Sequence, residues 1–162
     1  MIAIDFETYL IDNGAVFPKP VCLSWYDGKE TGLLNREEAR EYLSQKLIGN
    51  RDIIAHNAVF ECGVIVTHFP ELAESVFNAL DSGRIHCTKI NESLWNIQRE
   101  KALFGLTLAG LVKHYFDTDI SAGKGEDAWR MKYAELDGIP ISEWPKEAVD
   151  YAIDDSIWAY KI

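Results

Sequence analysis

The N-terminal residues alternate with the period-two pattern of a β-strand. Over Ile2–Phe6 the even positions are all apolar, whereas the odd positions carry Ala3, Asp5 and, just beyond, Glu7. Successive side chains of a strand point to opposite faces, so both acids leave the sheet on the same face. Because the neighbouring residues are apolar, we expect a core strand with two carboxylates at its end.

The remaining pattern divides into further strands and helices. Asn35 and Glu38 have the spacing of a capping box, which predicts a helix with Tyr42, Leu43 and Leu47 on its buried side. Asp-Gly at 27–28 is typical of a hairpin turn between two strands. The other expected elements are strands over 21–26, 31–34, 52–55 and 84–86, and helices over about 58–69, 72–80, 88–97, 107–116, 127–136 and 145–162.

The order of these elements is typical of an α/β domain. Strands that can pair antiparallel come first and strands alternating with helices follow, which favours an α/β sandwich around a mixed sheet. No repeat or linker divides the chain, and 162 residues fit one domain with a real core, so we expect a single domain over 1–162. Apolar residues make up 48% of the sequence, which excludes disorder as a description of the whole chain.

The charge balance restricts the class of function. Asp and Glu number 26 against 16 Lys and Arg, which gives a formal net charge of −10. A protein that holds duplex DNA by broad phosphate neutralisation needs a basic face, so this mode is disfavoured. An enzyme that holds a few nucleotides around metal ions stays compatible with the charge, because such a site is itself built from carboxylates.

The cysteines and the N-terminal residues indicate the compartment. Cys22, Cys62 and Cys87 are odd in number and lack Cys-x-x-Cys spacing, so we expect reduced, mainly buried thiols. The first residues lack the basic and apolar regions of a signal peptide, and the longest nearly apolar run, 102–112, is too short to cross a bilayer. We therefore expect a cytoplasmic protein that does not enter a membrane.

Two further polar pairs have helical spacing. Asn57 and Glu61 follow the strand at 52–55 and share a helix face near its carboxyl end, where α/β proteins place their sites. Tyr151 and Asp155 share a face of the last helix. Ordinary explanations stay open: the first strand can simply end in water, and the pair Asn57 and Glu61 can be an Asn cap followed by a solvated Glu.

The third pair has competitors elsewhere in the chain. Asp119 and Asp137 also follow a tyrosine by four residues, but both lie where a predicted helix ends. Only the last helix continues beyond its acid, far enough to pack rigidly against a sheet. Asp154 is one residue out of phase with the tyrosine, so we prefer Asp155.

These three groups, in this order, resemble the DEDD superfamily of 3′–5′ exonucleases, which has a ribonuclease-H-like fold. Residues 2–8 are similar to its first motif, 57–61 to its second, and 151–155 to its third in the tyrosine variant. The spacing of the histidine variant occurs at His114 and Asp119, but Asp119 lies in an expected loop, and no histidine follows His114. The phrases at 55–61, 87–89, 127–130 and 144–145 resemble proofreading exonuclease domains of family A DNA polymerases, those of bacteriophages in particular.

The resemblance implies a three-layer fold with a mixed five-stranded sheet flanked by helices, and a centre with two divalent ions, Mg²⁺ or Mn²⁺. Asp5 would bridge both ions, Glu7 and Asp155 would complete the first, and Glu61 would support the second through water. Most of the superfamily has Asp where this chain has Glu61, but the phage-like branch uses Glu, so we expect activity to be retained. Tyr151 would orient the attacking water, because an unperturbed phenol titrates near pH 10.

The resemblance also implies a substrate, the 3′ end of single-stranded or frayed DNA, and a nucleoside monophosphate product. Stacked aromatic side chains can hold such a strand without sequence preference. For Trp129 a place in the core of an amphipathic helix, beside Tyr133, is an equal alternative. The expected substrate-binding residues are Phe6, Thr8, Asn57 and Phe60 around the terminal nucleotide, and Lys124, Trp129 and Arg130, with Lys132 near them, where basic and aromatic residues interleave.

The expected role is proofreading for a phage-type DNA polymerase, in the cytoplasm of a bacterium or a phage-infected host. The excess acidity predicts a weak intrinsic grip on DNA, so we expect delivery by a polymerase on the same chain or on a separate one. Two other functions stay open. One is a 3′–5′ exoribonuclease of the same superfamily, and the other is a catalytically silent domain that binds nucleic acid or acts as a scaffold.

Overall fold

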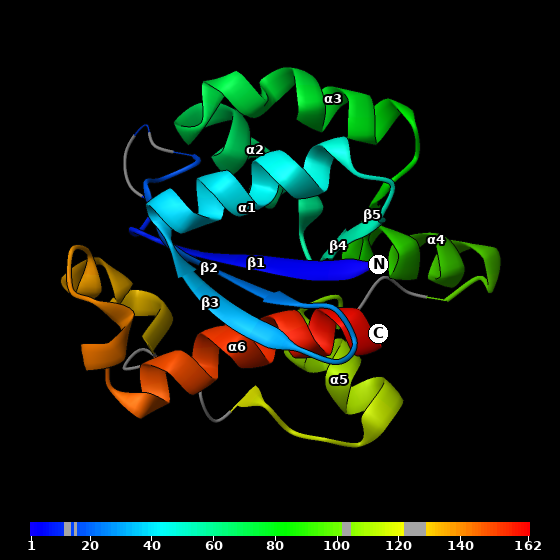
Figure 1. Ribbon diagram of the computed structural model, residues 1–162. Coiled ribbons are helices and arrows are strands. Elements are labelled where there is room, and N and C mark those ends of the chain that lie inside the picture. Colours follow the sequence, from blue (N-terminus) through cyan, green and yellow to red (C-terminus); the bar gives the residue numbers. More distant parts are fainter. Residues whose placement is uncertain (12–13, 15, 102–104, 122–128) are drawn as a thin grey trace.

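A five-stranded mixed sheet forms the centre of the computed structural model, which describes residues 1–11, 14, 16–101, 105–121 and 129–162. The strand order is β3-β2-β1-β4-β5 (Figure 1). The three strands of the N-terminal hairpins pair antiparallel, whereas β1, β4 and β5 pair parallel, which confirms the mixed sheet. The strands are β1 (Ile2–Thr8), β2 (Pro20–Tyr26), β3 (Thr31–Asn35), β4 (Ile53–Ala55) and β5 (Ile85–Cys87).

Helices cover both faces of this sheet, so the α/β three-layer architecture expected from the sequence is confirmed (Figure 1). One layer contains α1 (Arg36–Ile48), α2 (Ala58–His68) and α3 (Ala73–Asp81). The opposite layer contains α5 (Leu108–Phe116) and α6 (Lys146–Lys161), and α6 packs on the first four strands. The helix α4 (Thr88–Gln98) begins directly after β5, and short 3-10 helices occupy Pro70–Leu72, Trp129–Met131, Tyr133–Leu136 and Ile141–Glu143.

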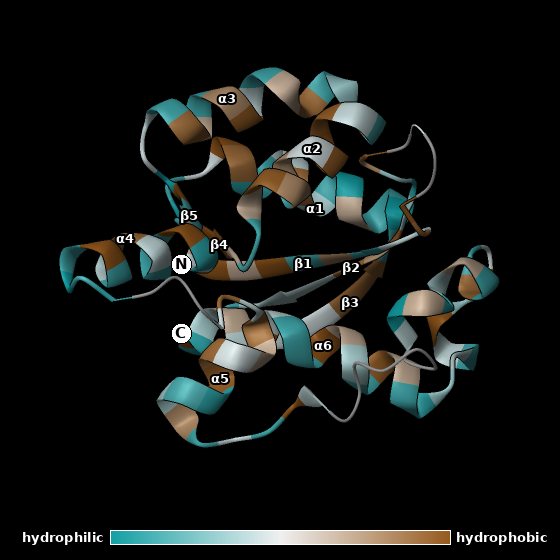
Figure 2. Cartoon of the chain, turned by 180° about the vertical axis from the view of Figure 1, so that it is seen from behind, coloured by the Kyte–Doolittle hydropathy of each residue, from teal (hydrophilic) through white to brown (hydrophobic). Residues whose placement is uncertain are grey.

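The alternation along β1 separates two hydrophobic cores, as its sequence predicts. Ile2, Ile4 and Phe6 pack in the larger core with α1, α2 and α3, and Ala3 packs in a smaller one against α6. Viewed from behind, the apolar residues of β1 and β3 lie between the two helix layers (Figure 2). The face that carries Asp5 is therefore the face that α6 covers.

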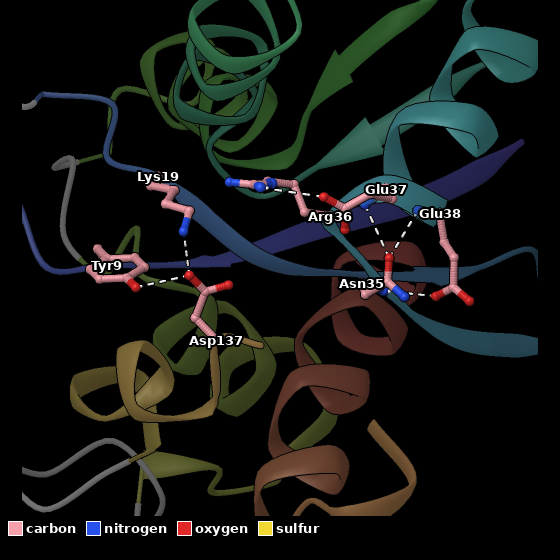
Figure 3. A network of polar contacts seen from close by, with 7 residues as sticks. All are labelled: Tyr9, Lys19, Asn35, Arg36, Glu37, Glu38 and Asp137. Atoms are coloured by element: carbon pink, nitrogen blue, oxygen red, sulfur yellow. Dashed lines mark hydrogen bonds and ion pairs between the residues drawn. The ribbon is translucent and has the colours of Figure 1, made fainter. Parts of the chain in front are cut away.

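Local signals in the sequence fix the first helix and the hairpin before it. The Asn35 side chain accepts hydrogen bonds from the backbone N–H groups of Glu37 and Glu38, and the Glu38 carboxylate accepts one from the Asn35 N–H (Figure 3). The predicted capping box is thus confirmed. Gly28 in the β2–β3 turn has a φ of 95°, a left-handed conformation that favours glycine.

The segment before the last helix differs from its expected α-helix over 127–136. In its described part, two 3-10 helices replace the α-helix. The reason is tertiary packing: Tyr133 is fully buried, with Trp129, Trp144 and Tyr151 around its ring, and its hydroxyl donates to the Ala148 carbonyl at 2.6 Å. A segment that wraps one aromatic anchor gains more from these contacts than from regular helical hydrogen bonds.

The cysteines have the free state that the sequence predicts. All three cysteines are free, with Cys22 and Cys87 buried and Cys62 partly so. In the described segments, no helix combines the length and the apolar character that crossing a membrane requires. Cys22 lies opposite Glu7 in the β1–β2 ladder, and burial raises the pKa of its thiol well above the ordinary value. This thiol therefore stays protonated in the core.

Candidate metal centre

Parallel pairing brings three polar strand ends to one edge of the sheet. Glu7 lies near the end of β1, Asn57 follows β4, and Thr88 follows β5. In parallel strands the carboxyl ends meet at the same edge, which is where open α/β sheets bind ligands. The helix α6 crosses this edge on the face of Asp5 and adds the side chains of Tyr151 and Asp155.

Three carboxylates meet where β1 and α6 cross. Asp5, Glu7 and Asp155 each offer an oxygen atom, and these atoms all lie within 4.8 Å of one another. Glu7 is only 7% exposed, so its charge is poorly hydrated. Like charges this close repel strongly in a partly buried place unless a cation neutralises them. Carboxylate oxygens are the ligands that Mg²⁺ and Mn²⁺ prefer, so this donor set fits a divalent ion.

Glu61 lies beside this cluster but makes a different contact. Its side chain is 3% exposed, and its Oε2 accepts a hydrogen bond from the Phe6 backbone N–H at 3.1 Å. Burial raises the pKa of the Glu61 carboxyl well above its ordinary value, with a further contribution from the negative charge of Asp5. The solvated Glu that the sequence left open is therefore wrong. Phe6 is one of the residues expected around the terminal nucleotide, and its backbone N–H is engaged by Glu61.

The last helix presents Tyr151 and Asp155 together to the centre. Asp155 is half-buried and belongs to the carboxylate cluster, whereas Asp154 is exposed. Burial raises the pKa of the Tyr151 phenol above its ordinary value, and the charges of Asp155 and Glu7 raise it further. At neutral pH this hydroxyl stays protonated, so it can donate a hydrogen bond but cannot act as a strong base.

A hollow of about 460 Å³ opens next to the carboxylates. A hollow of about 500 Å³ beside His86, Trp95 and Tyr160 is slightly larger, but no cluster of three possible metal ligands was found there among the described residues. The chemistry therefore favours the smaller hollow. The predicted site residues that line it are Asp5, Phe6, Asn57, Phe60, Glu61, Arg130 and Asp155.

Other predicted substrate-binding residues lie elsewhere. Trp129 packs against the core around Tyr133, with ring centroids 6.4 Å apart, which agrees with its alternative place in the core. The Thr8 hydroxyl donates to the Tyr9 carbonyl at 2.8 Å, and the side chain does not line the hollow. Lys124 lies outside the described residues. The structure thus brings together most of the acidic set but only part of the substrate-binding set.

The sequence reasoning missed two residues of the hollow, His56 and Lys89. The His56 ring joins three segments: its Nδ1 lies 2.8 Å from the Thr88 hydroxyl oxygen, and its Nε2 lies 3.0 Å from the Leu106 carbonyl oxygen. The second contact requires a proton on Nε2. His56 follows β4 directly and Lys89 follows β5 by two residues, so their positions at strand ends were the signal that could have found them.

Comparison with known proteins returns one family. A family model described as 3′–5′ exonuclease matches the chain over residues 1–162. No curated protein and no solved structure matches it. The matched range includes β1, the start of α2 and the whole of α6, so every segment that supplies a carboxylate to the centre lies within it.

Proposed function

This chain belongs to the 3′–5′ exonuclease family, and we propose that residues 1–162 form one domain that removes nucleoside monophosphates from the 3′ end of DNA with divalent metal ions. The observation that carries the proposal is the convergence of Asp5, Glu7 and Asp155 within 4.8 Å. A phosphodiester carries negative charge that increases toward the transition state of hydrolysis. Three clustered carboxylates at its binding site would repel it, and cations held between them would turn that repulsion into stabilisation of the transition state.

The carboxylates would hold the ions. Asp5, Glu7 and Asp155 would bind directly, and the resemblance to the DEDD superfamily implies that Asp5 would serve both ions. Glu61 would support the second ion through water while its other oxygen holds the Phe6 N–H. When bound, Mg²⁺ or Mn²⁺ would supply a hydroxide near neutral pH and stabilise the leaving 3′ oxygen.

The remaining residues of the centre orient the reactants. Tyr151 would donate its hydrogen bond to the attacking water, in agreement with the raised pKa of its phenol. This role corresponds to the tyrosine variant of the DEDD superfamily. Asn57 and Phe60, at the start of α2, line the hollow where the terminal nucleotide would lie. Arg130 enters the same hollow and would face a phosphate.

We assign DNA as the substrate and proofreading as the role because the motifs resemble those of proofreading exonuclease domains in phage-type family A DNA polymerases. The hollow is lined by residues at or just after the carboxyl ends of β1, β4 and β5, so a frayed single strand bound there would reach the carboxylates. The net charge of −10 supports delivery of the strand by a polymerase, in the same chain or in another. The polymerase partner is therefore part of the proposed function.

The direct test is degradation of a 5′-labelled single-stranded DNA in Mg²⁺ or Mn²⁺. Wild type should produce a ladder that shortens from the 3′ end, and EDTA should stop it. Asp5→Ala and Asp155→Ala should each lower the rate by about 10³-fold or more, because each removes a metal ligand. Asp154→Ala is the matched control: this acid is exposed and lies outside the cluster, so its rate should stay near that of wild type.

Equal nuclease activity in wild type and both ligand variants would end the assignment. The same assay with an RNA strand of matched sequence tests the exoribonuclease alternative. Faster cleavage of RNA than of DNA would identify RNA as the substrate. Complete absence of metal-dependent cleavage with either strand would leave the catalytically silent domain.

A further inference from the structure

Two cations enter a hollow that is otherwise rich in carboxylates. Lys89 and Arg130 both line it together with Asp5, Glu61 and Asp155. In the part of the chain that the structure describes, neither cation forms an ion pair with an acid. In a protein of net charge −10, two such cations in one hollow point to an anionic ligand.

The backbone around Lys89 is fixed by its neighbours. Lys89 is the second residue of α4, which begins as soon as β5 ends. The preceding Thr88 is 7% exposed, and its hydroxyl lies 2.8 Å from the His56 ring. No acid lies in the first turn of α4 to neutralise the lysine. The lysine is therefore anchored at its backbone and exposed at its side chain, as a residue that binds a ligand from solution must be.

We propose that Lys89 is a substrate-binding residue that holds a backbone phosphate of the DNA strand. This inference rests on the proposed exonuclease function. A strand that enters the hollow brings phosphates toward three carboxylates, and a cation on the wall offsets that repulsion. Lysine acts on a phosphate as a point charge with freely rotating donors, so it tolerates a strand that moves by one nucleotide after each cut.

The test compares Lys89→Gln, Lys89→Arg and Lys29→Gln. Lys29 is an exposed lysine in the β2–β3 turn and does not line the hollow, so Lys29→Gln removes the same charge elsewhere. Lys89→Gln should raise KM for a single-stranded oligonucleotide roughly tenfold with kcat little changed, which is the effect of one lost charged hydrogen bond. Lys89→Arg should stay near wild type.

A binding measurement separates this inference from the nuclease assignment. Anisotropy of a labelled oligonucleotide, with Ca²⁺ in place of Mg²⁺, needs no hydrolysis. For Lys89→Gln the dependence of log affinity on log salt should become shallower by about 0.7, the value for one single-strand phosphate contact. Equal affinity and slope in wild type and Lys89→Gln would overturn the inference, and so would an equal loss in Lys29→Gln. Absent cleavage by wild type would instead contradict the proposed function.

Discussion

Glu61 is the most unfavourably placed ionisable side chain of the centre. It is 3% exposed, and burial together with the charge of Asp5 raises the pKa of its carboxyl. A group with a raised carboxyl pKa destabilises the fold wherever it is ionised. Glu61→Gln keeps the size and the oxygen that accepts from the Phe6 N–H but removes the charge. We expect a higher melting temperature without metal and a large loss of nuclease activity.

Two further variants separate the charge of Glu61 from its size. Glu61→Ala should nearly abolish activity and should also lower the melting temperature, because the Phe6 N–H loses its acceptor and a cavity forms. Glu61→Asp keeps the charge on a shorter stem and should lose rate only modestly. Melting temperatures measured without metal and cleavage rates measured with metal distinguish the effect of the charge from that of the size. A Glu61→Gln variant as active as wild type would show that this carboxylate has no part in catalysis.

Tyr151 is expected to donate a hydrogen bond without ionising. Burial and the charges of Asp155 and Glu7 hold the pKa of its phenol above the ordinary value, so ionisation does not begin in the usual assay range. Tyr151→Phe should lower kcat by about 10–100-fold with KM little changed. The wild-type pH–rate profile should show no limb that Tyr151→Phe removes between pH 6 and 9. Such a limb would identify the phenol as a base and contradict the orienting role.

At the scale of elements, the turn between β2 and β3 is fitted against the end of α6. A Cβ added to Gly28 would lie 2.5 Å from the Tyr160 hydroxyl, and the Tyr160 ring is held edge-on by Tyr26 at 5.1 Å. Gly28→Ala should therefore destabilise the protein by about 2 kcal/mol, from backbone strain and a steric clash. Gly83 is the matched control, because its φ is also positive, at 70°, but nothing lies within 4 Å. Urea denaturation in which both variants lose equal stability would contradict the contact.

A polar contact fastens the β1–β2 loop to the segment before α6. The Asp137 carboxylate accepts hydrogen bonds from the Lys19 ammonium and, at 2.9 Å, from the Tyr9 hydroxyl (Figure 3). Lys19, first, and then Tyr9 lower the pKa of Asp137 below its ordinary value. The stabilisation is thus present above the pKa of unfolded Asp and is lost as the pH falls through the folded value. Asp137→Asn should cost about 1 kcal/mol at pH 7.

The pH dependence supplies the control for Asp137. Measured by urea denaturation from pH 7 into the acid range, the stability difference between wild type and Asp137→Asn should hold until the pH approaches the pKa of unfolded Asp, about 3.9, and should shrink as the pH falls on through the lower folded value. A constant difference across this range would show that Asp137 stabilises by packing alone.

Strand periodicity and capping residues predicted the elements well, because both act within a few residues. Asn35 with Glu38 marked the start of α1, and the alternation over Ile2–Phe6 correctly separated the two faces of β1. The segment around Tyr133 was assigned to the wrong kind of helix because its shape depends on rings from distant residues. Local helix propensity depends only on neighbouring residues, so it does not predict contacts with distant ones.

The acidic part of the centre was predictable for a different reason. Asp5, Glu7 and Asp155 lie at regular positions of long elements, so their faces follow from spacing alone. His56 and Lys89 follow the ends of β4 and β5, but only the contacts and exposure of the folded chain decide that they line the hollow. The Glu61 contact with the Phe6 N–H likewise depends on how closely α2 approaches β1, which no spacing rule fixes.

The whole molecule carries more negative charge than a compact fold favours, and its centre concentrates four acids. A net charge of −10 repels itself throughout, and three carboxylates within 4.8 Å of one another add a local repulsion that a bound cation would relieve. A ligand that binds only the folded state stabilises it by RT ln(1 + L/Kd), where L is the free ligand concentration. Mg²⁺ or Mn²⁺ at about a hundred times its Kd should therefore raise the melting temperature by about 5–10 °C.

Variants of the carboxylate cluster test whether the rise in melting temperature comes from metal bound at the centre. Asp155→Asn and Asp5→Asn should melt higher than wild type without metal, because each relieves repulsion, and should gain little from Mg²⁺. Asp154→Asn removes the same charge one residue away, outside the cluster, so it should keep the full shift. Potassium chloride at matched ionic strength measures general screening. If Asp155→Asn gained as much from Mg²⁺ as Asp154→Asn does, the ion would act on the overall charge and the three carboxylates would not form its binding site.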